Sequence, residues 1–201
     1  GDSAPVLMSF DARLVLSSAK EDRTVALADF FTGYRQTVLR ADEIIREIVV
    51  PRGGPAAGRT RRVEWVKVSH RAELDISIVA AAFRVDVDAA GVVREARLVY
   101  GGVAERTKRA LAAEEALVGK RLDEVSVSEA LRGEFTPIDD GRSGAAYRRG
   151  LVVSLWEKFV SGETSLVHDE TVTFAASSPW AVADATRALR HESAVGHVTG
   201  A

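Results

Sequence analysis

The sequence has no cysteine among its 201 residues. Without a thiolate, these residues cannot build a disulfide scaffold, a zinc ribbon or a cysteine-held iron–sulfur cluster. Aromatic residues make up only 6%, and methionine occurs once, as Met8. Because Gly1 is therefore not a natural translation start, we expect the chain to be part of a longer polypeptide.

The chain also lacks an excess of basic charge and a long apolar run. Lysine and arginine number 27 against 29 aspartates and glutamates, a formal net charge of −2, whereas a general nucleic-acid binder needs a marked basic excess. The apolar run 78–83 is far shorter than the roughly 20 residues that cross a bilayer. No signal peptide is visible. We expect no nucleic-acid partner, no membrane association and a cytoplasmic location.

What is present fits a globular α+β protein. Hydrophobic residues at 46% are enough for a core. Residues 1–51 have the patterns of short strands and turns, with one helical turn at Ala28–Phe31 and a strand near 43–50. Residues 52–62 form a basic loop with four arginines and mark a boundary. A solvated connector is favoured there over a contact with a phosphate or a partner.

Residues 63–160 predict a small antiparallel sheet of about three strands, packed with about three helices. The strands are expected at 63–69, 83–88 and 92–100. Alternating apolar and charged residues over 83–88 indicate a strand with one face buried and the other exposed. Gly101 and Gly102 end the last strand, and a turn is favoured over a ligand contact there.

Three helices are expected at Thr107–Val118, from Ser126 to about Gly133, and over 143–160. The second has capping-box spacing, in which Ser126 accepts from a free backbone N–H and Glu129 reaches back. Arg148 falls within the apolar face of the third, so it needs a carboxylate partner or an interface. Residues 161–190 are expected to form a linker or extended tail.

Most motifs that carry chemistry are missing. There is no Gly-x-Ser-x-Gly elbow, no G-x-G-x-x-G and no Walker loop, and the four histidines lack metal-ligand spacing. Lys67 lies on an apolar-flanked strand, with Arg71 and Asp75 in the connection that follows. Two readings of Lys67 stay open: a snorkelling side chain, or a cation held near an anionic or electron-accepting ring.

Five segments in order over about 160 residues resemble the flavin-binding part of the xanthine dehydrogenase family of molybdenum hydroxylases. They are GDSAP from Gly1, FTGYRQTVL from Phe31 with DEII from Asp42 and Pro51, VKVSHRAELDI from Val66, YGGVA from Tyr100, and AYRR from Ala146 with Lys158 and Phe159. The last eleven residues, 191–201, resemble the opening of the family's molybdenum-binding region.

The resemblance implies a division of the chain and a set of site residues. It makes 1–51 the end of the FAD-binding subdomain, 63–160 the flavoprotein C-terminal subdomain and 191–201 the start of the molybdenum-binding region. By position, the residues implied at the flavin are Asp2 near the ribityl–phosphate portion, Ile45 packed on the cofactor, Lys67 beside the ring, and Arg71 with Asp75 in the bordering loop. No catalytic residue or metal ligand is implied here.

The resemblance also implies a redox relay. Electrons from a molybdenum cofactor pass through two [2Fe–2S] clusters to FAD and reduce NAD there, and the partners are the iron–sulfur and molybdenum-binding domains of the same enzyme, in a homodimer. The family's two glycine-rich pyrophosphate loops do not occur in these residues, so we expect the chain alone to bind FAD weakly or not at all and to be inactive. Leu74 stands where animal members often carry another acid.

Two alternatives remain at this point. One is the FAD subunit of a related carbon monoxide, aldehyde or nicotinate hydroxylase. The other is a non-catalytic assembly module. Residues Tyr34–Thr37 and His197–Gly200 favour the xanthine dehydrogenase type.

Overall fold

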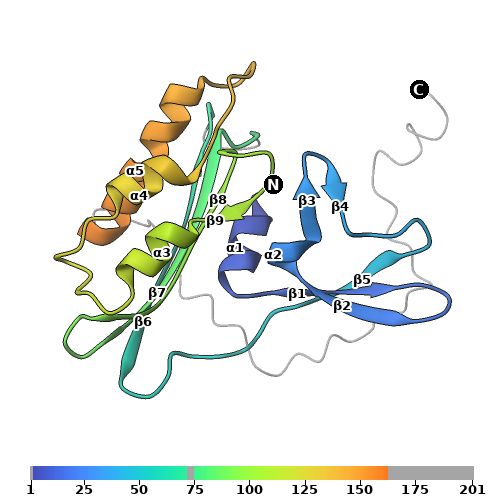
Figure 1. Ribbon diagram of the computed structural model, residues 1–201, viewed down its shortest axis with the longest axis horizontal. Coiled ribbons are helices and arrows are strands. Elements are labelled where there is room, and N and C mark those ends of the chain that lie inside the picture. The colour runs from blue at the N-terminus through green and yellow to red at the C-terminus, as the bar shows by residue number, and fades with distance from the viewer. Residues whose placement is uncertain (1, 72–74, 163–201) are drawn as a thin grey trace, which may run out of the picture. The chain divides into compact units, whose positions relative to one another are not determined.

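The computed structural model describes residues 2–71 and 75–162 (Figure 1). The helices are α1 (Ser3–Ser9), α2 (Leu27–Phe30), α3 (Leu111–Leu117), α4 (Ser128–Glu134) and α5 (Ala145–Ser161). The strands are β1 (Arg13–Ser17), β2 (Asp22–Ala26), β3 (Phe31–Gly33), β4 (Gln36–Thr37), β5 (Ile44–Val49), β6 (Arg59–Val68), β7 (Val79–Asp88), β8 (Val93–Gly101) and β9 (Lys108–Arg109). Most of the predicted tail, and all of 191–201, lie outside the described residues.

The first part is built on a three-stranded antiparallel sheet in the order β2-β1-β5. Its central strand buries Leu14 and Leu16, which pack with α1 and α2 in one core cluster. The predicted helical turn is present as α2. The expectation of strands and turns alone is wrong for 3–9, which form α1. Pro5 is tolerated in the first turn of this helix because its missing N–H would have no partner there.

The second part confirms the predicted arrangement of an antiparallel sheet with helices. The strands run in the order β6-β7-β8-β9, and Figure 1 shows α3, α4 and α5 on one side of this sheet and α1 on the other. The core between sheet and helices is aromatic: Phe83 and Trp156 meet edge to face with ring centroids 5.6 Å apart, and Phe83 lies 5.5 Å from Tyr100. Such pairs add to the free energy of apolar burial.

Element boundaries differ from the predictions at two helices. The helix expected at Thr107–Val118 begins only at Leu111, because Lys108 and Arg109 pair with β8 as the short strand β9. The expected capping box is also wrong. Val127 is the N-cap of α4, and the hydroxyl of Ser126 contacts that of Ser128 at 3.4 Å. Glu129 instead forms an exposed ion pair with Arg132, one turn later in the helix.

The predicted loop 52–62 is shorter in the structure, because β6 begins at Arg59. The guanidinium of Arg61 explains the extension. Its Nε and Nη2 donate to the two carboxylate oxygens of Asp86 at 2.7 and 2.8 Å, across the β6–β7 pair. A bidentate pair of this kind fixes the register as well as the charge. Of the four arginines predicted in the loop, Arg61 therefore stabilises the β6–β7 pairing.

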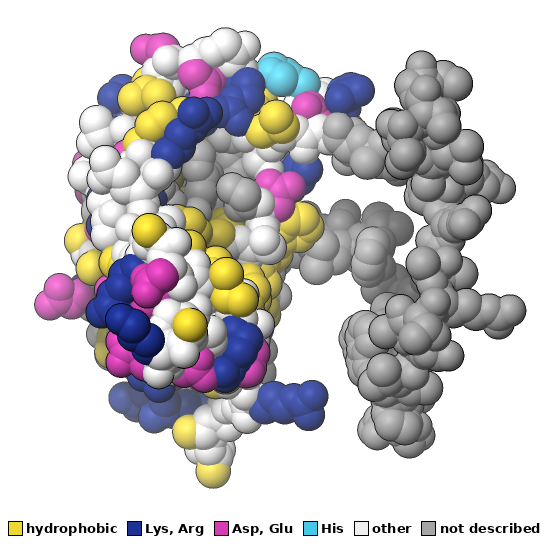
Figure 2. All heavy atoms as spheres, turned by 90° about the vertical axis from the view of Figure 1, so that its right-hand side faces the viewer, with side chains coloured by type: hydrophobic (Ala, Val, Ile, Leu, Met, Phe, Trp, Pro, Cys, Tyr) yellow, Lys and Arg dark blue, Asp and Glu magenta, His cyan; other side chains and the backbone are white. Residues whose placement is uncertain are grey.

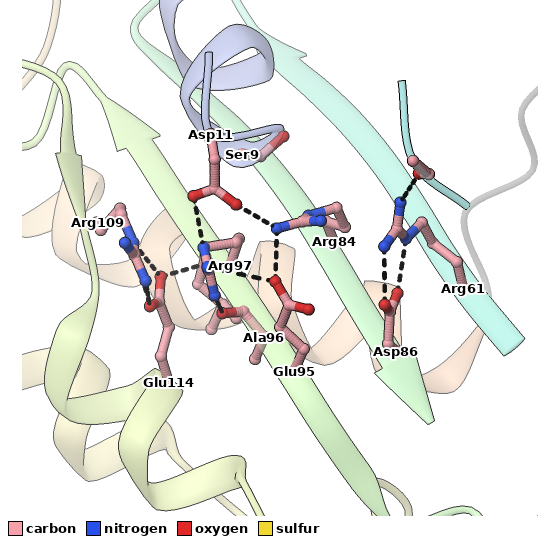
Figure 3. A network of polar contacts seen from close by, with 12 residues as sticks. Ser9, Asp11, Arg61, Arg84, Asp86, Glu95, Ala96, Arg97, Arg109 and Glu114 are labelled. Atoms are coloured by element: carbon pink, nitrogen blue, oxygen red, sulfur yellow. Dashed lines mark hydrogen bonds and ion pairs between the residues drawn. The ribbon is translucent and has the colours of Figure 1, made fainter. Parts of the chain in front are cut away.

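The expectation that one face of 83–88 is exposed is wrong as well. Arg84 is only 7% exposed and Asp86 only 2% exposed, because the α1 segment covers the polar face. Figure 3 shows the resulting chain of ion pairs, in which Asp11, just after α1, accepts from Arg84 at 2.7 Å and from Arg97 at 2.8 Å. Each buried charge needs a partner to offset its desolvation. Asp11 thereby fastens the first part of the chain to the second.

The connection before β5 is held by another buried carboxylate, Glu43. Its side chain is 2% exposed and accepts from Arg23 Nε at 2.6 Å, Arg23 Nη2 at 2.8 Å and the Arg40 N–H at 2.8 Å. The hydrogen bonds from Arg23 are the main cause that lowers the pKa of Glu43 to about 2. The carboxyl is ionised more easily in the folded chain than in the unfolded one.

This lowered pKa gives a testable pH dependence. Stabilisation by Glu43 is fully present above its ordinary pKa of 4.5 and is lost as the pH falls toward about 2. We expect Glu43→Gln to flatten the fall in unfolding free energy over this window, measured by urea titrations across the pH series. Glu47→Gln, at an exposed carboxylate on β5, is the control. Equal slopes for wild type and Glu43→Gln would contradict the assignment.

Among the described residues, no helix has the length and apolar character needed to span a membrane.

Candidate functional site

Polar side chains from distant parts of the sequence meet at the start of α1. Lys67 on β6 places its Nζ 2.8 Å from Asp2 Oδ2 and donates to the main-chain oxygen of Asp75 at 2.5 Å. The hydroxyl of Ser77 donates to the other carboxylate oxygen of Asp2. Three of the five sequence-predicted site residues therefore form one hydrogen-bonded cluster, which we call the Lys67 cluster (Asp2, Lys67, Asp75 and Ser77).

The sheet positions Lys67 through its side-chain alternation. Residues 61, 63, 65 and 67 of β6 share a face, and Lys67 stands opposite the small Ala80 of β7. α1 packs against β7 and β8 on this side of the sheet, and this brings Asp2 beside the Lys67 ammonium.

The side chain of Asp2 is directed toward Lys67 and Ser77. Asp2 is the N-cap residue of α1, yet its side chain makes no capping hydrogen bond. The hydrogen bonds from Lys67 and Ser77, in that order, lower the pKa of the Asp2 carboxyl below its ordinary value. The site thus contains a fixed carboxylate and a fixed ammonium in contact.

Asp75 organises the loop that borders Lys67. Its carboxylate accepts from the Ile76 N–H at 2.8 Å and from the Arg71 N–H at 3.0 Å, and these bonds, the Ile76 one first, lower its pKa. The guanidinium of Arg71 lies 4.0 Å from Asp75 and is mostly exposed. Arg71 therefore joins the cluster through Asp75. Leu74 lies outside the described residues.

Ile45 is placed apart from the Lys67 cluster. It lies on β5, in the sheet β2-β1-β5, and its side chain is 44% exposed. Its neighbours Ile44, Ile48 and Val49 are exposed too. Figure 2 shows the side of the described part that carries this sheet, with hydrophobic side chains gathered beside charged ones. The structure leaves an apolar surface at Ile45 but does not bring it into contact with Lys67.

Two residues of the site escaped the sequence analysis. Trp65 shares the strand face of Lys67, and its indole N–H donates to the main-chain oxygen of Asp2 at 3.2 Å. The alternation of side chains along β6 puts Trp65 on the same face as Lys67 and so could have identified it as a site residue. Ser77 follows the loop and has no pattern that distinguishes it from other serines.

The arrangement can hold a planar, electron-accepting group. Lys67 supplies a positive charge whose position is fixed by two oxygen partners. Trp65 and Ile76 nearby are exposed apolar side chains, which favour an aromatic ring over a free ion. A ring that gains negative charge on reduction is stabilised by a nearby cation.

Comparison with known proteins agrees with this chemistry. Residues 1–53 match the family model described as the FAD binding domain in molybdopterin dehydrogenase. Residues 64–162 match the CO dehydrogenase flavoprotein C-terminal domain. The chain belongs to the FAD-binding region of the xanthine dehydrogenase family of molybdenum hydroxylases.

Curated relatives share this region as part of much longer chains. A xanthine dehydrogenase of Blastobotrys adeninivorans is 37% identical over 169 residues, which cover 80% of this chain and 12% of the relative. A nicotinate hydroxylase of Emericella nidulans is 35% identical over 166 residues, 79% of this chain and 12% of the relative. The FAD-binding region described here therefore spans about an eighth of the length of these relatives.

Solved structures share the fold. A carbon monoxide dehydrogenase from Hydrogenophaga pseudoflava that lacks the Mo-pyranopterin moiety of the molybdenum cofactor superposes with a TM-score of 0.69 at 28% identity, covering 79% of this chain and 54% of that one. Quinoline 2-oxidoreductase from Pseudomonas putida 86 has a TM-score of 0.68 at 24% identity, covering 81% and 55% of the two chains. The α+β arrangement of this FAD-binding region is thus shared with these two solved structures.

The residues present fit FAD at the Lys67 cluster. The isoalloxazine of FAD is a flat ring with polar edge atoms, and Lys67 beside exposed Trp65 offers a cation next to an aromatic surface. The Asp2 carboxylate and the Ser77 hydroxyl are of the kinds that hydrogen-bond to hydroxyl groups such as those of the ribityl chain. The exposed ring of Trp65 thus suits the flat ring of the cofactor, and the polar atoms of the Lys67 cluster suit its polar groups.

Proposed function

We propose that this region holds FAD with the isoalloxazine ring beside Lys67, in a xanthine dehydrogenase-type enzyme that relays electrons from two [2Fe–2S] clusters to FAD and on to NAD. The observation that carries the proposal is the fixed ammonium of Lys67, held by Asp2 and by the Asp75 carbonyl next to exposed apolar side chains. When bound, FAD supplies the two-electron redox chemistry.

The chain's own residues have separate tasks in this proposal. Lys67 keeps a positive charge beside the ring and favours electron density arriving there. Asp2 contacts the ribityl–phosphate portion and holds Lys67 in place. Ile45 provides apolar surface for the cofactor, and Arg71 with Asp75 forms the bordering loop, where charge influences the choice between NAD and dioxygen as the acceptor.

The partners follow from the same proposal. Residues 1–51 are the end of the FAD-binding subdomain, 63–160 are the flavoprotein C-terminal subdomain, and 191–201 begin a molybdenum-binding region. The iron–sulfur clusters and the molybdenum cofactor then belong to other domains of the same cytoplasmic enzyme, which forms a homodimer. The xanthine dehydrogenase and nicotinate hydroxylase relatives, each matched over most of this chain and a small share of their own length, support a multidomain enzyme.

A related hydroxylase is the second candidate. The similarity to nicotinate hydroxylase at 35% identity is close to that of the xanthine dehydrogenase at 37%, and the fold is shared with a carbon monoxide dehydrogenase. The FAD task of the region would be the same, and only the oxidised substrate would differ.

The electrostatic role of Lys67 is tested by Lys67→Met in the complete protein that contains this region. Removing this charge is expected to cost the reduced, more negative ring on the order of 1–3 kcal/mol of electrostatic stabilisation, at an effective dielectric constant of about 20. The flavin midpoint potential should fall accordingly. Flavin reduction should slow while the thermal unfolding midpoint stays near that of wild type. Spectroscopic redox titration measures the potential.

Lys120→Met is the matched control, since Lys120 is an exposed lysine in the turn after α3. It should leave the potential unchanged. If Lys67→Met also leaves the potential and the rate of flavin reduction unchanged, Lys67 is a snorkelling side chain and the proposed placement of FAD is wrong.

A further inference from the structure

Trp65 makes a contact that the proposed flavin site does not by itself require. Its indole N–H donates to the main-chain oxygen of Asp2 at 3.2 Å, and its ring is 40% exposed on the face of β6 that also carries Lys67. A half-exposed tryptophan leaves apolar surface in contact with water, which is unfavourable. The indole N–H nevertheless has a specific partner, Asp2, which is also the residue that pairs with Lys67.

Asp2 is therefore held at two levels. Trp65 holds its main chain, while Lys67 and Ser77 hold its carboxylate. Trp65 and Lys67 are two residues apart on one strand, so their side chains start about 7 Å apart on the same face. Two donors at this spacing, one to the backbone and one to the side chain of a single residue, restrict both the position and the rotamer of Asp2.

A competing arrangement of Asp2 explains why this restriction matters. Aspartate is among the preferred N-cap residues, because its carboxylate accepts from a free N–H of the first helical turn. Asp2 occupies the N-cap position of α1 but makes no such bond. Asp2 has helical backbone angles, φ −76° and ψ −31°, whereas an N-cap residue whose carboxylate accepts from the first turn is extended. Turning the carboxylate to the helix and away from Lys67 would therefore rotate ψ of Asp2 and move its main-chain oxygen. The bond from Trp65 to this oxygen opposes that rotation.

We propose that Trp65 is a positioning residue of the flavin site, which acts through Asp2 to keep the Asp2–Lys67 ion pair in its cofactor-binding arrangement. The inference rests on the proposed function, since it assigns Trp65 a part in the same FAD site. The indole N–H acts by holding Asp2, so the effect of losing this N–H on FAD binding must depend on the presence of Lys67, whereas the apolar surface of the ring does not depend on it.

A double-mutant cycle on the complete protein tests this dependence. The dissociation constant of FAD is measured by titrating flavin-depleted protein with FAD, for wild type, Trp65→Phe, Lys67→Met and the double variant. Trp65→Phe keeps an aromatic ring and removes the N–H. A neutral hydrogen bond contributes about 1 kcal/mol, so we expect about 5-fold weaker binding, and loss of a charged partner in Lys67→Met should weaken binding about 10-fold or more. In the Lys67→Met background, Trp65→Phe should change the constant less than about 2-fold.

Each outcome decides between the readings. No weakening by Trp65→Phe in the wild-type background, with weakening by Lys67→Met, overturns the inference and leaves the proposed function standing. Equal effects of Trp65→Phe in both backgrounds also overturn it, because Trp65 then acts independently of the ion pair. If Lys67→Met itself leaves FAD binding unchanged, the proposed function fails.

Controls separate positioning from stability. Tyr147→Phe removes a hydroxyl from an exposed aromatic residue of α5 and should leave the FAD constant unchanged. If Trp65→Phe lowers the unfolding midpoint so far that binding cannot be compared, the cycle is repeated with 3-benzothienylalanine at position 65. This residue keeps the shape of the indole and replaces its N–H by sulfur, so the same 5-fold loss is expected, and its absence contradicts the inference.

Discussion

Gly102→Ala is expected to destabilise the protein by about 3–5 kcal/mol, from left-handed backbone strain and a backbone clash together. Gly102 has a φ of +84°, and a Cβ there would press into the carbonyl of Ile78, with the carbonyl carbon at 3.2 Å and the oxygen closer still. The two segments cannot easily move apart, because the carbonyls of Ile78 and Gly102 both accept from Arg148 Nη1, at 3.0 and 2.6 Å. Urea unfolding of the two proteins measures the loss.

Gly119→Ala is the matched control for this prediction. Gly119 has almost the same φ, +83°, but a Cβ there would have no neighbour within 4 Å. Its cost should be the conformational one alone, about 1–2 kcal/mol. If the two variants lose the same free energy, the close approach of Gly102 to Ile78 contributes nothing, and the account of this turn is wrong.

Arg148→Met is expected to cost about 3–5 kcal/mol of stability, the loss typical when one member of a buried ion pair is removed. Arg148 is 3% exposed and donates through Nη2 to Asp140 Oδ1 at 2.6 Å, as well as to the two carbonyls beside Gly102. Methionine keeps much of the aliphatic length but leaves Asp140 and both carbonyls without this donor. The stability of the variant is measured by thermal and urea unfolding.

The neighbouring Arg149 offers the comparison. It is an exposed arginine on the next position of α5, so Arg149→Met should change the unfolding free energy by less than about 0.5 kcal/mol. Comparable losses for the two variants would show that Arg148 contributes only as a surface charge. A loss confined to Arg148 supports its role as the junction between β7, β8 and the start of α5.

The sequence was sufficient for those elements whose patterns are local. The hairpin over β7 and β8 follows from alternation and a turn at Asp88–Gly91. The apolar arc of α5 predicted the helix and the need of Arg148 for a carboxylate partner or an interface, and the partner is Asp140. Contacts made at long range were not visible. The start of α3 depends on the pairing of Lys108 and Arg109 with β8. A helical pattern in the sequence cannot show that these two residues pair as a strand instead of forming the first turn of the helix.

The polar face of β7 shows the same limit. Alternation identifies Arg84 and Asp86 as polar positions, but it does not show that α1 and Asp11, more than 70 residues earlier, cover them. At the site, the resemblance implied five residues around one cofactor: Asp2, Ile45, Lys67, Arg71 and Asp75. The structure connects four of them through Lys67 and Asp75 and leaves Ile45 on another sheet. Trp65 and Ser77 were not found because their roles depend on where Asp2 comes to lie.

The most direct test of the central claim is the position of FAD in an experimental structure of the complete, FAD-loaded protein. The account predicts the isoalloxazine ring in contact with the Lys67 ammonium, with Asp2 still paired to Lys67 and Trp65. Flavin bound elsewhere, with the Lys67 cluster facing solvent or another protein segment, would contradict it.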